Sequence, residues 1–204
     1  MEPATARQGE IIAAALDIVS EHGLEALTMK NIAARVGFSD AAVYRHFQNK
    51  SCILSAMVDR FAFSSIRKLD RISASESSGL EKVQQFFLDR CRTFAADRAL
   101  ATIMFAEDLF KSEPALAAKI HGVMHDHRQL LLKSIRRGQH QGLLKSLPAE
   151  HLFTIIMGSL RLLVLQWHVD HCGFELQQAG EKLWRTLETL IANKKGAPHE
   201  KKNH

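Results

Sequence analysis

The 204-residue chain contains only four prolines, at positions 3, 114, 148 and 198, and no stretch alternates polar and apolar residues over the length of a β-strand. Apolar residues instead recur at helical spacing, as Ile12, Leu16 and Val19 do, which places them on one face of an α-helix. Proline disrupts helix interiors, so its scarcity leaves long segments able to form helices. The sequence therefore predicts an all-α fold.

The first 60 residues contain two unusually short helical segments between two longer ones. Thr28 and Ser39 are typical N-caps for the short segments, Asn49 is one for the long segment that follows, and Gly23 and Gly37 are typical helix ends. A tight glycine turn between two short helices is the spacing of a helix-turn-helix, in which the second helix enters the major groove of DNA.

Beyond residue 64 the pattern changes to longer helices joined by polar segments. Residues 73–79 are rich in serine and predict a loop. Pro114 and Pro148 are each expected to begin a helix. The helices predicted in this part of the chain cover residues 80–94, 100–110, 114–141, 148–167 and 175–191.

The net charge is +5, from 27 Lys and Arg against 22 Asp and Glu, and this excess suggests an anionic partner such as nucleic acid. The excess does not lie in the segment with the short helices. Residues 1–50 contain five basic and six acidic side chains, while residues 111–150 contain seven basic and three acidic ones. DNA binding would therefore depend on a few placed contacts and on helix N-termini.

Three features indicate a cytoplasmic protein with no membrane partner. The three cysteines are far apart and lack CxxC spacing, as expected of reduced thiols. The N-terminal segment has acidic residues before its first apolar run, unlike a secretory signal. The longest apolar stretch, residues 155–167, is too short to span a bilayer and contains Arg161.

Three motifs between Glu10 and Leu54 carry a family resemblance: A-L-D-I-V-x-E-H-G, L-T-M-x-x-I-A-x-x-V-G-F-S and V-Y-R-H-F-x-N-K. In them the chain resembles the N-terminal DNA-binding domain of the TetR (tetracycline-repressor) family of bacterial transcriptional regulators. The resemblance implies a homodimeric repressor, without a cofactor, that a small-molecule effector releases from a palindromic operator in double-stranded DNA. We expect a helix-turn-helix domain over residues 6–63, called the headpiece below, an effector-binding and dimerisation domain over 64–194, and a disordered tail over 195–204.

The resemblance also implies roles for individual headpiece residues. Thr28 caps the first helix of the motif and donates its hydroxyl to a phosphate, while Ser39 caps the second, the recognition helix. Tyr44, His46 and Lys50 contact the DNA backbone, with the helix N-terminus behind Lys50 favouring phosphate.

Four residues of the recognition helix would face the bases, namely Asp40, Ala41, Ala42 and Arg45. Arg45 can donate two hydrogen bonds to guanine, and Ala42 can contact a thymine methyl group. Asp40 either accepts a hydrogen bond from cytosine N4 or stabilises the first turn of its helix, and we favour the second role.

Apolar and sulfur-containing side chains in the middle of the chain are candidates for the effector site, although such residues at helical spacing are more often part of a core. Arg161 differs because leucines flank it. Its charge would emerge at an interface, pair with Glu107 or Asp108, or meet an anionic ligand. The candidate effector-binding residues are Met104, Phe105, Phe110, Met124, Met157, Arg161 and Trp167.

The last two predicted helices each carry an apolar face that one subunit would cover only in part. The resemblance implies that they pair with the same helices of a second subunit as a four-helix bundle, with Gly158 allowing close approach. The alternative is that both faces are buried within one subunit. The candidate dimer-interface residues are Ile155, Gly158, Leu162, Leu165, Leu183, Leu187 and Ile191.

Two other interpretations of the function stay open on sequence alone. In the first, the same DNA-binding dimer responds to a protein partner instead of a small molecule, or acts as an activator instead of a repressor. A metal-binding sensor or an enzyme is less favoured, because no nucleophile elbow, phosphate loop or His-Glu-x-x-His motif is present. We expect no metal and interpret two histidine groups as solvated side chains: His121, His125 and His127, and His168, His171 with Cys172.

Overall fold

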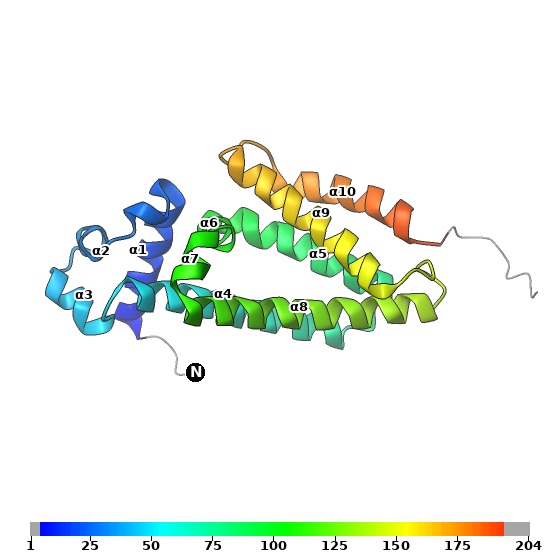
Figure 1. Cartoon of the computed structure of the whole chain (residues 1–204), viewed down its shortest axis with the longest axis horizontal. Coiled ribbons are helices and arrows are strands. Elements are labelled where there is room, and N and C mark those ends of the chain that lie inside the picture. Colours follow the sequence, from blue (N-terminus) through cyan, green and yellow to red (C-terminus); the bar gives the residue numbers. More distant parts are fainter. Residues whose placement is uncertain (1–4, 194–204) are drawn as a thin grey trace, which may run out of the picture.

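The computed structural model describes residues 5–193, apart from the side chains of Glu107 and Phe110. The predicted all-α fold is confirmed, since the β-type pairing within these residues is a single bridge between Leu144 and Ala192. Figure 1 shows a lobe of short helices at one end of an elongated helical bundle. The elements are α1 (Ala6–His22), the 3-10 turn η1 (Leu24–Ala26), α2 (Met29–Val36), α3 (Asp40–His46), α4 (Lys50–Ala74), α5 (Gly79–Ala96), α6 (Arg98–Met104), α7 (Glu107–Ser112), α8 (Pro114–His140), α9 (Ala149–Val169) and α10 (Leu176–Ile191).

Local capping interactions start the headpiece helices where the sequence predicts. The side-chain oxygens of Thr28, Ser39 and Asn49 each accept the backbone N–H three residues later, at 3.1, 3.3 and 2.9 Å. Gly37 ends α2 in the left-handed conformation, with φ of +71°, which residues with a Cβ rarely adopt. These caps keep α2 and α3 short and separate.

Two segments of the prediction differ from the structure, one by an internal break and one by its length. The helix expected over residues 100–110 is two helices, α6 and α7, because the chain turns at residues 105–106 without a proline or glycine to mark the break. The loop expected over residues 73–79 is shorter, since α4 continues to Ala74 and α5 begins at Gly79.

The headpiece and the bundle share packing. α4 runs without a break through the expected division between residues 63 and 64, and the expected tail over 195–204 lies outside the described residues. The apolar core around α1, α2 and α3 also contains buried residues from two bundle helices. These are Ala99 and Ile103 of α6, and Leu116 and Ile120 of α8.

The second core lies among α5, α8, α9 and α10, where Phe86, Phe87 and Trp184 are fully buried. Helices α5 and α10 approach closely at Gly180, because a Cβ there would lie 2.5 Å from the Sγ atom of Cys91. Burial raises the pKa of the Cys91 thiol to about 12. This cysteine is therefore an unreactive packing residue.

Candidate nucleic-acid interface and ligand cavity

Helix α3 is anchored on one side and exposed on the other. Val43 is fully buried in the headpiece core. Asp40, Ala41 and Arg45 are exposed, and Ala42 is half-buried. A helix held in this way can enter a groove without disturbing the core that fixes its angle.

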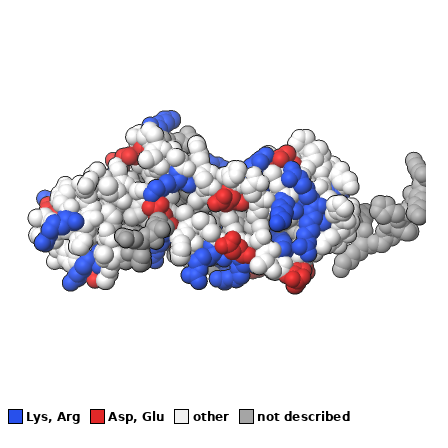
Figure 2. Space-filling model, turned by 90° about the horizontal axis from the view of Figure 1, so that it is seen from below, with Lys and Arg blue, Asp and Glu red and all other residues white. Residues whose placement is uncertain are grey.

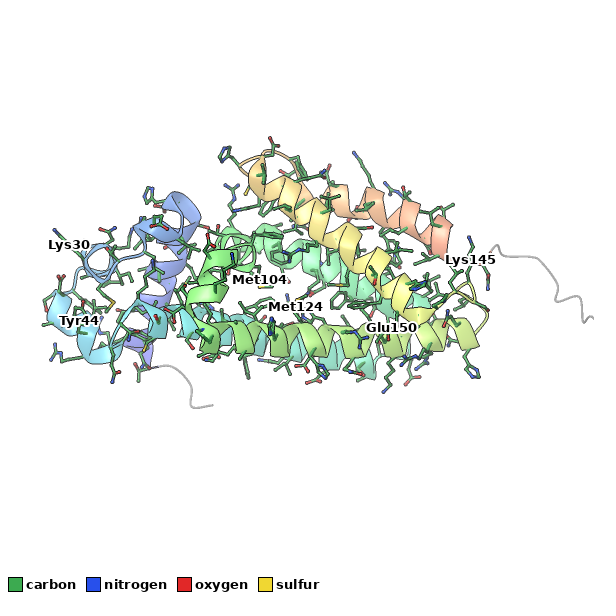
Figure 3. The ribbon with its side chains drawn as sticks, in the orientation of Figure 1. Lys30, Tyr44, Met104, Met124, Lys145 and Glu150 are labelled. Carbon is green, nitrogen blue, oxygen red and sulfur yellow. The ribbon has the colours of Figure 1, made fainter. Side chains whose placement is uncertain are left out.

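Tyr44 and Lys30 lie at the outer edge of the headpiece, away from the bundle (Figure 3). The Tyr44 side chain is 51% exposed, and Lys30 on α2 is also exposed. Sequence reasoning missed Lys30, although its position two residues after the N-cap Thr28 marks a cation beside a helix N-terminus. The oxygens of Thr28 and Ser39 accept backbone N–H groups, so their hydroxyl hydrogens remain able to donate to phosphate.

Two cations of the headpiece are engaged inside it. Lys50 Nζ donates to the backbone carbonyl of Leu24 at 3.0 Å and so ties the start of α4 to η1. An ammonium has three N–H bonds, so two remain for a phosphate. Arg35 donates to both carboxylate oxygens of Glu21, at 3.1 and 2.6 Å. His46 is half-buried.

Basic side chains are sparse on the headpiece and denser elsewhere. On the face in Figure 2, Lys and Arg gather over the end of the bundle farthest from the headpiece. Lys133 and Arg136 line a groove between α4 and α8 in this half of the bundle. The charge excess is therefore separated from the helix-turn-helix, in agreement with the local charge balance of the sequence.

A cavity of about 250 Å³ lies among α4, α5, α6, α8 and α9. Phe and Met side chains form most of its wall. Met104 and Met124, labelled in Figure 3, lie in the half of the bundle nearer the headpiece. Five of the predicted effector residues line this cavity: Met104, Phe105, Met124, Met157 and Arg161.

The structure corrects two expectations about this region. Trp167 does not line the cavity but lies in the bundle core, where its indole N–H donates to the Phe174 carbonyl at 3.0 Å. Asp108 does not pair with Arg161, because it lies 3.2 Å from Lys111. The Arg161 guanidinium instead lies over the ring of Phe105, 4.9 Å from its centroid. The side chains of Glu107 and Phe110 lie outside the described part of the chain.

Three buried polar side chains meet at one end of the cavity. Arg90 and His127 line it, and Ser65 lies between them. Arg90 Nη1 donates to Ser65 Oγ at 3.0 Å, and Ser65 Oγ lies 2.7 Å from His127 Nε2. Exposed fractions of 2%, 1% and 5% for Arg90, Ser65 and His127 show that the expectation of a solvated His127 is wrong.

Burial and the charge of Arg90 together lower the pKa of His127 to about 3. The imidazole is therefore neutral near pH 7. Sequence reasoning missed Arg90 and Ser65. An arginine among the phenylalanines of α5 is a local signal of a functional position, whereas nothing near Ser65 in the sequence marks it.

Helix α6 connects the cavity with the headpiece. Ile103 is buried in the headpiece core, while the next residue, Met104, forms part of the cavity wall. A molecule that displaces Met104 would therefore act on a helix that packs against α1.

Helix α9 presents an apolar stripe to solvent in the single chain. Ile155, Leu162 and Val169 are 45%, 55% and 68% exposed, and they recur every seven residues along the helix. Gly158 is also exposed, with nothing within 4 Å of where its Cβ would be. A seven-residue apolar repeat is the spacing of a helix–helix seam.

Two predicted dimer residues on α10 are wrong. Leu187 and Ile191 are 3% and 2% exposed and belong to the core of the single chain. Leu165 and Leu183 are half-buried, and Leu190 is the exposed leucine on α10, at 58%.

Helix α9 has 21 residues and is apolar enough to cross a membrane, by length and composition alone. One side of it, with Leu152, Ile156 and Leu160, is packed into the bundle core. Core helices of soluble proteins pass the same test of length and composition.

Neither histidine group forms a metal centre in the part of the chain that the structure describes, where no cluster of three His, Cys, Asp or Glu side chains is arranged to hold an ion. His121 and His125 are exposed. His168 stacks on Phe105, with ring centroids 6.2 Å apart.

Comparison with known proteins agrees with these features. A family model described as "Bacterial regulatory proteins, tetR family" matches residues 11–57, and one described as "YsiA-like protein, C-terminal region" matches residues 61–190. The chain is 26% identical over 182 residues to the nucleoid occlusion factor SlmA of Pasteurella multocida, covering 85% of this chain and 87% of the relative. It is 23% identical over 186 residues to the fatty acid metabolism regulator protein of Bacillus subtilis, covering 91% and 95%.

The fold is also that of a solved regulator. The structure of the transcriptional regulator FadR from Bacillus subtilis in complex with stearoyl-CoA matches with a TM-score of 0.73 at 22% identity, and the match covers 89% of this chain and 97% of that one. The two family models together match most of the sequence, from the helix-turn-helix to α10. The chain therefore belongs to the TetR family of bacterial regulatory proteins.

Proposed function

We propose that this ligand-responsive, DNA-binding regulator is a homodimeric repressor that leaves a palindromic operator when a small molecule fills the cavity. One observation carries the proposal: α6 contributes Met104 to the cavity wall and the preceding residue, Ile103, to the headpiece core. DNA binding in the cytoplasm, rather than catalysis, is its proposed activity.

The proposed DNA contacts are of two kinds. Thr28, Tyr44, His46 and Lys50, with Lys30 added, bind phosphates and fix the position of the headpiece on the duplex. The exposed side of α3 reads bases in the major groove, with Arg45 as the main donor. Ser39 and Asp40 mainly stabilise the start of α3, because both lie at its N-terminus.

A second copy of the chain would cover the stripe of Ile155, Leu162 and Val169. Burying three large apolar side chains contributes several kcal/mol, at about 25 cal/mol per Å² of apolar surface. In a two-fold dimer the same patch serves both subunits. Two headpieces would then enter successive major grooves about 34–36 Å apart.

The effector acts by preferring one conformation. A ligand shifts DNA affinity only through its different affinity for the DNA-bound and free conformations, so DNA must weaken effector binding by the same factor. The solved relative in complex with stearoyl-CoA supports a small molecule, rather than a protein partner, as the effector.

A gel-shift titration of the purified protein with DNA from upstream of its own gene tests the proposal. We expect a retarded band at low salt and two-fold symmetric protection of the bound sequence. Failure to retard any neighbouring promoter fragment at low salt would overturn it.

A further inference from the structure

Arg90 carries an unused hydrogen-bond donor at the cavity. Its Nη1 donates to Ser65 and its Nη2 to Asp89. Its Nε is buried and has no hydrogen-bond partner within residues 5–193. A buried charged donor without a partner is costly, and an acceptor on a bound molecule would remove that cost.

His127 supplies a second donor. Its Nε2 faces the Ser65 hydroxyl at 2.7 Å and Arg90 Nη1 at 3.5 Å. Because a guanidinium can only donate, Nε2 must hold the lone pair and accept from Ser65. The proton of the neutral ring is then on Nδ1. Both residues line the cavity, so each has one N–H group that a bound molecule can accept from.

The local charge balance favours an anion. Arg90 and Lys68 share one carboxylate, that of Asp89, and Lys68 Nζ lies 3.4 Å from its Oδ1. Two cations against one anion leave a surplus positive charge, since His127 is neutral. Arg161 adds a further cation to the cavity wall.

The remaining wall is apolar, and the space is small. Phe61, Phe94 and Phe153 face it together with Met124 and Met157. At roughly 30 Å³ per non-hydrogen atom, the volume of liquid water per molecule, a 250 Å³ cavity holds about eight such atoms. Methionine side chains adjust to admit a few more.

From this geometry we propose that the effector is a small amphipathic monocarboxylate of roughly eight to twelve non-hydrogen atoms. Its carboxylate accepts hydrogen bonds from Arg90 Nε and His127 Nδ1, and its apolar body packs against the Phe and Met side chains. The assignment rests on the proposed function for the role of the cavity as the effector site.

Calorimetric titration of the full-length protein with octanoate and with octanamide tests the assignment. The two probes have nearly the same shape and differ in charge. Charge-assisted hydrogen bonds favour octanoate by roughly tenfold or more in Kd. Equal binding of octanamide, or no binding of octanoate, would refute the proposed ligand class.

A pair of matched variants locates the carboxylate. Arg90→Met is expected to reduce the preference for octanoate to within about twofold. Arg136→Met, in the groove between α4 and α8 and away from the cavity, should keep the preference. If the Arg90→Met variant still prefers octanoate over octanamide as strongly as the unaltered protein does, Arg90 does not contact the carboxylate. Because Arg90→Met removes one of the two cations beside Asp89, the double variant Asp89→Asn/Arg90→Met is added, which keeps the local net charge of the unaltered protein. If both variants fail to fold, the comparison of octanoate with octanamide on the unaltered protein decides.

DNA binding, measured on the same preparation, separates this assignment from the proposed function. Octanoate should weaken binding to the upstream DNA. Retardation of that DNA by a protein that binds no octanoate refutes the ligand class alone. Octanoate binding without any DNA binding refutes the proposed function and supports the carboxylate site. Bound octanoate that leaves DNA affinity unchanged overturns its role as the effector.

Discussion

Nζ of Lys119 on α8 lies 2.7 and 2.6 Å from the two carboxylate oxygens of Asp59 on α4. The same ammonium donates to the Ser55 hydroxyl at 2.6 Å. This contact fastens the first half of α8, which borders the cavity at Met124, to the part of α4 nearest the headpiece.

Replacing Asp59 by Asn should destabilise the protein modestly. The pair is about one-third exposed, so we expect a loss of about 0.5–1 kcal/mol in the free energy of unfolding, measured by urea denaturation. Asp126→Asn, at an exposed position on α8, is the control. A loss no larger than that of the control would contradict a structural role for the pair.

Variants of the headpiece should separate positioning contacts from base reading. Tyr44→Phe and Lys30→Ala are expected to weaken all DNA sequences alike, and Lys30→Ala should lower the slope of log affinity against log salt by about one. Arg45→Ala should relax the choice of base at one operator position, at a cost of about 1–3 kcal/mol. Gel shifts on operator variants measure both effects. Equal weakening of every base variant by Arg45→Ala would exclude base reading by this residue.

A charge in the α9 stripe should prevent dimerisation. Leu162→Arg puts a cation on a surface that the dimer would dehydrate, so light scattering should give the mass of one chain. Ile66→Arg, at a similarly exposed position on α4, should leave the mass unchanged. If the Leu162→Arg protein is still a dimer, the dimer interface does not include the α9 stripe.

Acid should destabilise the protein through His127. The pKa of this residue is about 3 when folded, because burial and Arg90 disfavour the imidazolium, against 6.5 for an unperturbed histidine. The unfolded chain therefore binds the proton first, and stability that is complete above pH 6.5 declines as the pH falls towards 3. At pH 5 the loss amounts to about 2 kcal/mol relative to pH 7, measured by urea unfolding.

The His127→Gln variant should lack that decline, while His121→Gln, at an exposed position, should keep it. An unchanged pH dependence in His127→Gln would show that the ring is not buried in its neutral form.

Two glycines on helices should respond in opposite directions to alanine. Gly180→Ala places a Cβ 2.5 Å from Cys91 Sγ, so α5 and α10 must separate at a cost of about 1–3 kcal/mol. Gly122→Ala meets nothing within 4 Å and should stabilise α8 by about 0.5–1 kcal/mol. Thermal unfolding of both variants measures the difference. A harmless Gly180→Ala substitution would show that the two helices are not in close contact there.

The sequence predicts the headpiece well because its signals are local. Caps such as Thr28 and Ser39 act on backbone groups three residues away, so each helix start can be located from a few neighbouring letters. The break between α6 and α7 has no such marker. Neither proline nor glycine occurs near residues 105–106. The two short helices instead pack on different neighbours, α6 on α1 and α9 and α7 on α8, and the contacts of α6 come from distant parts of the chain.

The cluster of Ser65, Arg90 and His127 at the cavity could not be predicted from the sequence, for a different reason. Ser65, Arg90 and His127 come from three helices and meet only after α4, α5 and α8 have packed. Helical periodicity identifies which residues face inwards, but not which inward positions on different helices meet. The same limit explains Leu187 and Ile191, whose apolar side fits α5 and α9 of the same chain.

The unbroken course of α4 sets how far a small adjustment in the bundle travels. Its 25 residues span about 37 Å, so a tilt of only about 5° at the bundle end displaces the other end by about 3 Å. That distance is close to one base-pair step of about 3.4 Å. In a dimer, opposite tilts of the two copies would put both recognition helices out of phase with the operator while leaving every headpiece contact intact.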